Sequence, residues 1–249
     1  MNKNKFDILT FSKLSEGIDF YLNESFHYIN EVLINEYASL LFSKLIETKD
    51  FLDKDIEIIS KLDIPEKPVE LLQSSDLDPI TDETAMDLSE LWNKAQLYSR
   101  SNNYNFGKDH KIVSIEILGH LNSFAFFIET LTNRHLLFLY QTKSIDEFSY
   151  NRISKARILE RLIYIFKDEL KYNKIQFNEI SNLFRMRNLT VHFTPENVRK
   201  LNPTISQLIK IWKQSKIIVE KFEQREKFNE ELYSIKIDNY TTDFKSKWT

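Results

Sequence analysis

Apolar residues recur at steps of three and four over much of the second half of this chain, and this period constrains the fold more than any other feature. Similar apolar stripes cover residues 111–140, 152–172, 176–190 and 198–222. The longest stripe consists of Ile117, Leu121, Phe124, Ile128, Leu131 and Phe138. Such stripes are typical of amphipathic helices that bury one face. Because the connections between them are short, we expect an antiparallel helical bundle over residues 109–235.

The composition supports an all-α fold. The chain has 249 residues but only 3 Gly and 5 Pro, so few residues favour tight turns. This scarcity argues against a sandwich of short strands and against a Gly-rich phosphate loop. Cysteine is absent, which excludes disulfides, Cys-ligated zinc, iron–sulfur clusters and thiol catalysis.

The first half of the chain predicts additional helices before the bundle. A helical pattern covers residues 25–48. Shorter helical segments follow at residues 53–62, 67–74 and 83–99, separated by prolines. The polar stretch 100–110 is the best candidate linker. We therefore expect a helical N-terminal region over 1–108, whose role the sequence does not indicate, and a C-terminal tail over 236–249.

Single residues carry further expectations for the bundle. Pro203 predicts the first turn of the last helix, with Asn202 as its N-cap. His135 and Trp212 both fall on apolar stripes, so we expect them in the core.

Charge is unevenly distributed, although the net charge is only -3. Residues 49–90 contain 13 acidic and 4 basic residues, a net charge of -9. Residues 185–221 contain 8 basic and 2 acidic residues, a net charge of +6. A basic segment of this kind could contact a polyanion, or it could be an ordinary solvated helix face.

One arginine occupies an unusual position in the third stripe. Arg187 lies seven residues after Ile180 and three after Phe184, so it continues the apolar face. Arg185 is rotated about 160° from it at 100° per residue. An arginine on a bundle-facing stripe is uncommon unless it meets an anion or a carboxylate.

His192 follows Arg187 by five residues, and Pro195 ends the segment. In an unbroken helix the two side chains would be about 140° apart. If the helix ends near residues 189–190, the next turn can bring the imidazole beside the guanidinium. A histidine there could take the proton from a ribose 2′-OH, while the arginine stabilises charge on the phosphorane. Such a reaction requires no metal ion.

The sequence Arg187-Asn188-Leu189-Thr190-Val191-His192 resembles the R-x4–6-H motif of the HEPN superfamily, the higher eukaryote and prokaryote nucleotide-binding domains. In that family an Asn, Asp or His often follows the Arg. The resemblance covers about residues 109–230. It implies a metal-independent endoribonuclease without a cofactor, in which a homodimer forms a composite site. It also implies a toxin–antitoxin, abortive-infection or other defence context, with an antitoxin or nucleotidyltransferase as partner.

Each candidate residue has a role in this hypothesis. His192 is the general base or acid, Arg187 stabilises the transition state, and Asn188 positions the phosphate or the histidine. Glu129 lies in an apolar run, where a carboxylate needs a partner, and could orient Arg187. The basic residues Arg199 and Lys200 would guide the RNA backbone.

Plainer interpretations remain open. Arg187 could form only a structural ion pair with Glu129, His192 could cap the next helix, and Asn188 could simply be a residue at the end of its helix. The protein would then be an inactive HEPN-like module that binds RNA, a nucleotide or a partner protein, or a helical scaffold. Glu116 and His120 are spaced like two metal ligands on one helix face, but two ligands are not a site, and we expect no metal.

The sequence shows no targeting segment. The N-terminus has neither an apolar core of 7–15 residues nor a small-residue cleavage site. The most apolar stretch, residues 112–128, is shorter than the ~20 residues of a membrane span and contains polar residues. We therefore expect a cytoplasmic protein with no membrane partner.

Overall fold

The computed structural model describes residues 8–48, 89–90, 92–93, 95–97, 99–100, 109–172, 175–191, 201–227 and 232–249. These residues form helices and no β-strand, which confirms the all-α prediction. The chain divides into two compact units: Met1–Ile29 with Phe106–Thr249, and Asn30–Asn105. Among the described residues, no helix combines the length and the apolar character needed to cross a membrane.

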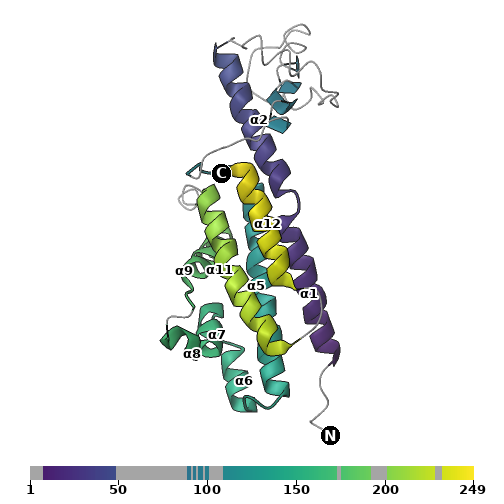
Figure 1. The fold of residues 1–249 in the computed structure, drawn as a ribbon, viewed down its shortest axis with the longest axis vertical. Coiled ribbons are helices and arrows are strands. Elements are labelled where there is room, and N and C mark those ends of the chain that lie inside the picture. Colours follow the sequence, from purple (N-terminus) through teal and green to yellow (C-terminus); the bar gives the residue numbers. More distant parts are fainter. Residues whose placement is uncertain are drawn as a thin grey trace. The chain divides into compact units, whose positions relative to one another are not determined.

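Four long helices build the larger unit: α1 (Ile8–Phe26), α5 (Glu116–Gln141), α11 (Ile205–Glu226) and α12 (Tyr233–Trp248) (Figure 1). α1 packs antiparallel to α5, and α12 packs antiparallel to α11. α5 and α11 run in the same direction, because four shorter helices return the chain between them. These are α6 (Glu147–Ile153), α7 (Ile158–Ile165), α8 (Lys167–Lys171) and α9 (Asn178–Val191).

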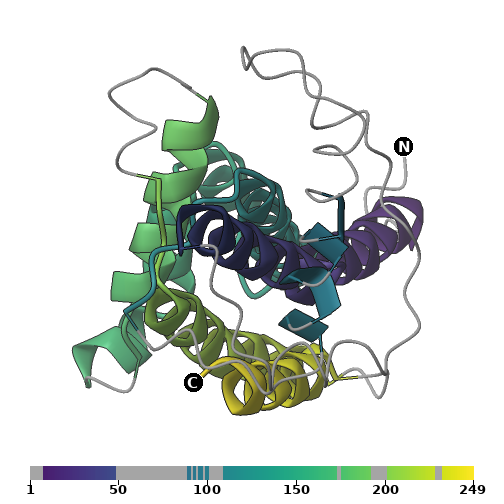
Figure 2. The ribbon, with the colours of Figure 1, turned by 90° about the horizontal axis from the view of Figure 1, so that it is seen from above.

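α5 is the central helix of this unit, with α1 on one side and α9 on the other (Figure 2). Its apolar stripe is buried as the sequence predicted: Ile117, Leu121, Phe124, Ile128 and Leu131 are at most 2% exposed. Trp212 of α11 is also buried, and its ring meets Phe244 of α12 edge-on, with centroids 4.8 Å apart. Burial of these apolar faces is the main driving force for packing the helices.

The beginning of α11 differs from the sequence prediction. Thr204, not Asn202, is the N-cap, so Pro203 precedes the helix and does not form its first turn. The Thr204 hydroxyl accepts a hydrogen bond from the Gln207 N–H at 3.1 Å, and the Gln207 side chain accepts one from the Thr204 N–H at 2.9 Å. This reciprocal capping satisfies the N–H groups of Thr204 and Gln207. The Pro203 carbonyl instead accepts from Ile112 N–H at 2.9 Å.

The second stripe, residues 152–172, is not one helix. It contains the separate helices α7 and α8, which meet at Phe166, a fully buried residue with φ of -107°. The apolar period runs through Phe166 because this residue is part of the core. The stripe therefore predicted its burial correctly, but the prediction of one continuous helix was wrong.

Two helices of the larger unit were not assigned from the apolar pattern, although α1 lies within the region 1–108 that was expected to be helical. α1 covers residues before the helical pattern at 25–48, which begins in the structure only at α2 (Ile29–Thr48). Tyr28 separates the two helices with a positive φ of 56°. α12 contains most of the residues assigned to a C-terminal tail, and its Ile237, Phe244 and Trp248 are fully buried.

The smaller unit has a minor core of its own. Ala38 and Ala95 are buried, and Phe42 and Trp92 pack against them. The two rings meet each other edge-to-face, with centroids 5.4 Å apart. Polar contacts join the same two segments: Gln96 donates to Asn35 at 3.0 Å, and Arg100 pairs with Glu31 at 3.0 Å. The helices predicted at 53–62 and 67–74 lie outside the described residues.

Candidate functional site

Arg187 lies on α9 where that helix faces α5. Ile180, Leu183 and Phe184 of α9 are buried and hold the helix against the bundle. The N–H groups of Glu179 and Ile180 at the start of α9 donate to the Gln214 side chain of α11, at 2.8 and 3.0 Å. α9 is thus fixed at its apolar face and at its N-terminus, which positions Arg187 near its other end.

The Arg187 guanidinium pairs with a carboxylate from the middle of α5. Arg187 Nη2 lies 3.6 Å from Glu129 Oε2, with 28% of the arginine side chain and 27% of the glutamate side chain exposed. The contact that the sequence suggested between these two residues is therefore present. It is half-exposed and long for an ion pair, so it leaves part of the guanidinium accessible.

A second arginine shares the same carboxylate, and sequence reasoning missed it. Arg161 Nη1 lies 3.6 Å from Glu129 Oε1 and donates to the Asn133 side chain at 2.6 Å. Its Nε donates to the Ala156 carbonyl at 2.8 Å. A sequence signal for this group was present on α5, where Asn122, Glu129 and Asn133 recur at steps of seven and four within an apolar helix.

Arg187 also has unused hydrogen-bonding capacity. Its Nη1 lies 3.3 Å from the side-chain oxygen of the exposed Asn188, and its guanidinium lies over the Phe126 ring, 5.1 Å from the centroid. Its Nε is buried, and it has no hydrogen-bond partner in the described part of the chain; the same holds for Asn122 Oδ1 on α5. A buried donor without a partner is costly unless a ligand or water satisfies it.

Three of the predicted site residues, His192, Arg199 and Lys200, lie outside the described residues. The structure brings together Arg187, Asn188 and Glu129. α9 ends at Val191, one residue beyond the end near 189–190 that would bring the imidazole beside the guanidinium. The Thr190 hydroxyl donates to the Met186 carbonyl at 2.8 Å, as is common for threonine within a helix.

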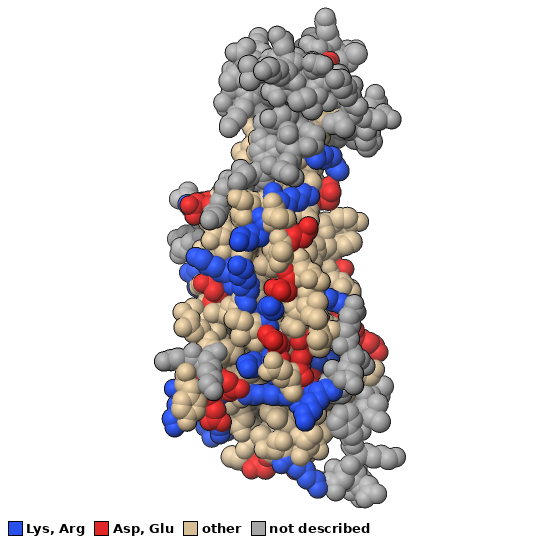
Figure 3. All heavy atoms as spheres, in the orientation of Figure 1, with Lys and Arg blue, Asp and Glu red and all other residues tan. Residues whose placement is uncertain are grey.

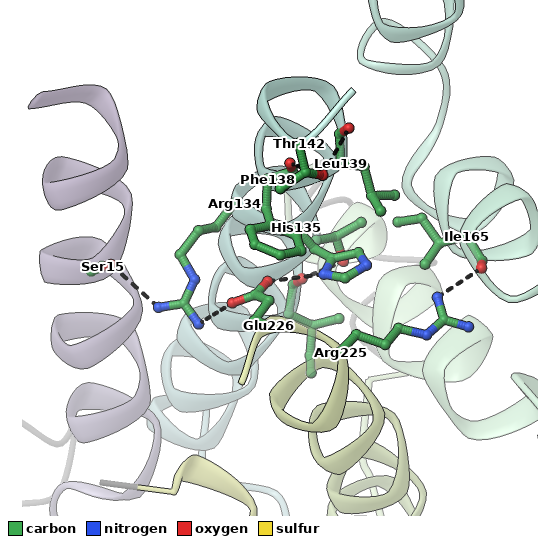
Figure 4. A network of polar contacts seen from close by, with 11 residues as sticks. Ser15, Arg134, His135, Phe138, Leu139, Thr142, Ile165, Arg225 and Glu226 are labelled. Carbon is green, nitrogen blue, oxygen red and sulfur yellow. Dashed lines mark hydrogen bonds and ion pairs between the residues drawn. The ribbon is translucent and has the colours of Figure 1, made fainter. Parts of the chain in front are cut away.

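His135 is a core residue, as the apolar stripe predicted. It is fully buried, and its Nδ1 lies 2.9 Å from Glu226 Oε1 of α11 (Figure 4). Arg134 pairs with the other oxygen of Glu226 at 2.8 Å and donates to the Ser15 hydroxyl of α1 at 3.2 Å. This network ties α5, α11 and α1 together.

The pair Glu116 and His120 shows no third metal ligand. His120 Nδ1 lies 2.8 Å from the Glu24 main-chain oxygen, a contact that occupies the nitrogen. Within the residues that the structure describes, no group of three or more His, Cys, Asp or Glu residues could hold a metal ion.

The described part of the basic segment does not form a uniform positive surface. On the face that carries α11 and α12, basic and acidic side chains alternate (Figure 3). Lys216 of α11, for example, pairs with Asp238 of α12 at 3.2 Å. One lysine of the basic segment is thus paired across to α12, although α12 itself carries three lysines and two aspartates.

Comparison of this chain with protein-family models, with curated proteins and with solved structures finds no match.

Proposed function

We propose that this protein is a metal-independent endoribonuclease of HEPN type that cleaves RNA by attack of a ribose 2′-OH on the adjacent phosphate. One observation carries the proposal. Arg187, the first residue of the R-x4-H motif, keeps 28% of its side chain exposed beside Glu129, and Arg161 helps to hold the same carboxylate. Its buried Nε has no hydrogen-bond partner in the described part of the chain.

The motif supplies the groups that this reaction requires. His192 accepts the proton of the 2′-OH as its oxygen bonds to phosphorus. The Arg187 guanidinium stabilises the charge that develops on the phosphorane oxygens, and Asn188 can donate a hydrogen bond to the same phosphate. The bond to the 5′-oxygen then breaks, and that oxygen takes a proton from solvent. The products are a 2′,3′-cyclic phosphate end and a 5′-hydroxyl end.

Glu129 and Arg161 support the site without touching the reacting atoms. Glu129 lies between the two guanidiniums, 3.6 Å from each. Because Arg161 is itself anchored to Asn133 and to the Ala156 carbonyl, the carboxylate has a fixed position from which to orient Arg187. In the same proposal Arg199 and Lys200 contact the RNA backbone, and a homodimer acts in a toxin–antitoxin or phage-defence system.

The test is an RNA cleavage assay with the full chain in excess EDTA. Wild type is compared with His192→Ala, Arg187→Ala and Arg185→Ala. Arg185 is the matched control, because it lies two residues from Arg187 on the exposed face of α9. We expect 2′,3′-cyclic phosphate products from wild type and Arg185→Ala, and at least a 100-fold slower reaction, about the effect of losing one transition-state donor, from the other two.

Cleavage that persists in folded His192→Ala protein would contradict the proposal. RNA binding without cleavage in all four proteins would also contradict it and would favour an inactive HEPN-like binding module. Circular dichroism and thermal unfolding verify that each variant is folded before its activity is interpreted.

A further inference from the structure

A row of aromatic rings begins at Arg187 and crosses from α5 to α1. Phe126 of α5 lies under the Arg187 guanidinium, 5.1 Å from it. Tyr21 of α1 packs against Phe126 with ring centroids 5.4 Å apart, and Phe20 meets Tyr21 edge-on at 5.4 Å. We call Phe20, Tyr21 and Phe126 the aromatic row.

The row is exposed at both ends. Phe20 is 60% exposed and Phe126 is 36% exposed. Single exposed apolar residues are common on protein surfaces and require no explanation. Here, however, three neighbouring rings from two helices end at the guanidinium of Arg187, whose side chain is 28% exposed.

The surface beside the row is polar. On the same side of α5, one helical turn from Phe126, Asn122 carries a buried side-chain oxygen with no hydrogen-bond partner in the described residues. Ser123 and Glu129 are partly exposed on neighbouring positions of the helix. The core of a protein–protein interface is depleted of charged groups, whereas a site for nucleotides combines flat rings with hydrogen-bonding groups and a cation.

We propose that the aromatic row is a stacking platform for the nucleobases of single-stranded RNA. This inference rests on the proposed function, because it assigns the scissile phosphate to Arg187 and the flanking bases to the rings. Bases of unpaired RNA stack on aromatic side chains and on arginine planes, and every base has a π-face, so the platform tolerates many sequences. It therefore selects unpaired RNA over duplex RNA, whose bases are already stacked.

The decisive experiment measures binding of two probes to the full-length His192→Ala protein, which does not consume RNA. One probe is a fluorescent oligoadenylate of about twelve nucleotides, near the upper range of single-strand site sizes. The other is an abasic ribose-phosphate chain of the same length and charge. We expect oligoadenylate to bind about tenfold more tightly, because stacking adds to the electrostatic attraction that both probes share.

Two substitutions in the row and one outside it identify the source of that preference. Phe20→Ala removes the most exposed ring, and Phe126→Leu removes an aromatic face while keeping an apolar side chain on α5. Each is expected to weaken oligoadenylate binding about fivefold and to leave the abasic probe unaffected. Phe148→Ala is the matched control, since Phe148 is 75% exposed on α6, outside the row.

Each outcome has a distinct meaning. Equal affinity for the two probes, or the same loss from Phe148→Ala, overturns the platform. If Phe20→Ala and Phe126→Leu instead convert a dimer into monomers in sedimentation without changing RNA affinity, the row is an interface with a second copy and the inference is overturned. If base preference is found but wild type cleaves no RNA, the platform stands and the proposed function fails. If wild type cleaves RNA but shows no base preference, the proposed function stands and the platform is overturned.

Discussion

Two arginine–glutamate clusters lie on opposite sides of α5, and they differ in burial and distance. In the first, the core cluster of Arg134, His135 and Glu226, the side chains of Arg134 and Glu226 are 6% and 1% exposed and 2.8 Å apart. In the second, the surface cluster of Glu129, Arg161 and Arg187, Glu129 and Arg187 are 27% and 28% exposed and 3.6 Å apart.

The difference decides how much each cluster should contribute to the stability of the fold. Removing one partner of a buried ion pair leaves the other charge buried and uncompensated. Such a substitution therefore strongly lowers the stability of the fold. A half-exposed pair at 3.6 Å contributes little to stability, because water screens it. Polar residues on an apolar helix are therefore not equal candidates for function. Residues of the surface cluster can be changed with little loss of stability, so they are the better candidates for binding a ligand.

The largest effect should follow from removing the charge of the core cluster. Glu226→Gln preserves shape but removes the negative charge that lies 2.8 Å from the buried guanidinium of Arg134. We expect the free energy of unfolding to fall by about 3–5 kcal/mol, as measured by urea denaturation.

The matched control for that substitution is Glu220→Gln, an exposed glutamate on the same helix. It should change stability by no more than about 0.5 kcal/mol. A loss below about 1 kcal/mol for Glu226→Gln would mean that the core cluster is not a structural element and that burial does not separate the two clusters.

A smaller effect is expected at high pH from Tyr233, which lies beside the core cluster with Arg134 over its ring at 5.9 Å. Burial, and then the Asp19 carboxylate, raise the pKa of Tyr233 to about 12 from 10.0. The unfolded chain therefore loses this proton first as the pH rises. Stability from Tyr233 is complete below pH 10.0 and is lost as the pH approaches 12.

The measurement compares wild type with Tyr233→Phe by urea denaturation across that pH range. The wild type should lose stability more steeply between pH 10 and 12, because the variant lacks the titrating hydroxyl. Parallel curves would show that the tyrosine is not shielded and that the region around Arg134 is open to water.

The sequence predicted the apolar side of the larger unit better than its polar side. The stripe from Ile117 to Leu131 predicted both the helix and its buried face, because a helical period reports burial directly. The same period could not show that Phe166 interrupts a helix, since a buried residue satisfies the stripe with or without helical dihedrals. It also missed α12, whose polar residues outnumber its buried ones.

For the candidate site, the sequence predicted the pair and missed its neighbours. A contact between Arg187 and Glu129 was one of the possibilities considered, because each is a charge on an apolar face, and the structure shows it. Arg161 was missed, since it lies on a different helix and only the packing of α7 against α5 brings it to Glu129. The contact of Phe126 with α1 was equally hidden, because no separate helix was assigned before residue 25. The motif residues are neighbours in sequence and can be recognised there, whereas Arg161 and Tyr21 come from other helices and are found only in the folded structure.

The next effect, smaller in stability, concerns Arg187 itself. Arg187→Ala should lower the free energy of unfolding by no more than about 1 kcal/mol, because its ion pair is half-exposed. The same substitution should slow RNA cleavage at least 100-fold, about the effect of losing one oxyanion donor. Measuring both quantities on one preparation tests the comparison directly. A stability loss as large as that of Glu226→Gln would make Arg187 a structural residue.

The smallest effect on stability should come from Glu129→Gln, and it is the most informative about the site. Gln keeps the volume and a hydrogen-bonding oxygen between Arg161 and Arg187, so we expect a change within about 0.5 kcal/mol. Two functional quantities should then move in opposite directions. RNA binding should tighten a few-fold, because one negative charge near the phosphate is lost.

The single-turnover cleavage rate of Glu129→Gln should fall about tenfold, because the guanidinium loses the carboxylate that orients it. Kd from fluorescence anisotropy and the rate from single-turnover assays separate the two effects. If binding and rate both weaken, Glu129 contacts the RNA. If neither changes, Glu129 is a bystander to Arg187, and the surface cluster differs from the core cluster only in exposure. A positioning role requires the split between tighter binding and slower cleavage, since only a residue that repels the phosphate while aiming the arginine produces both.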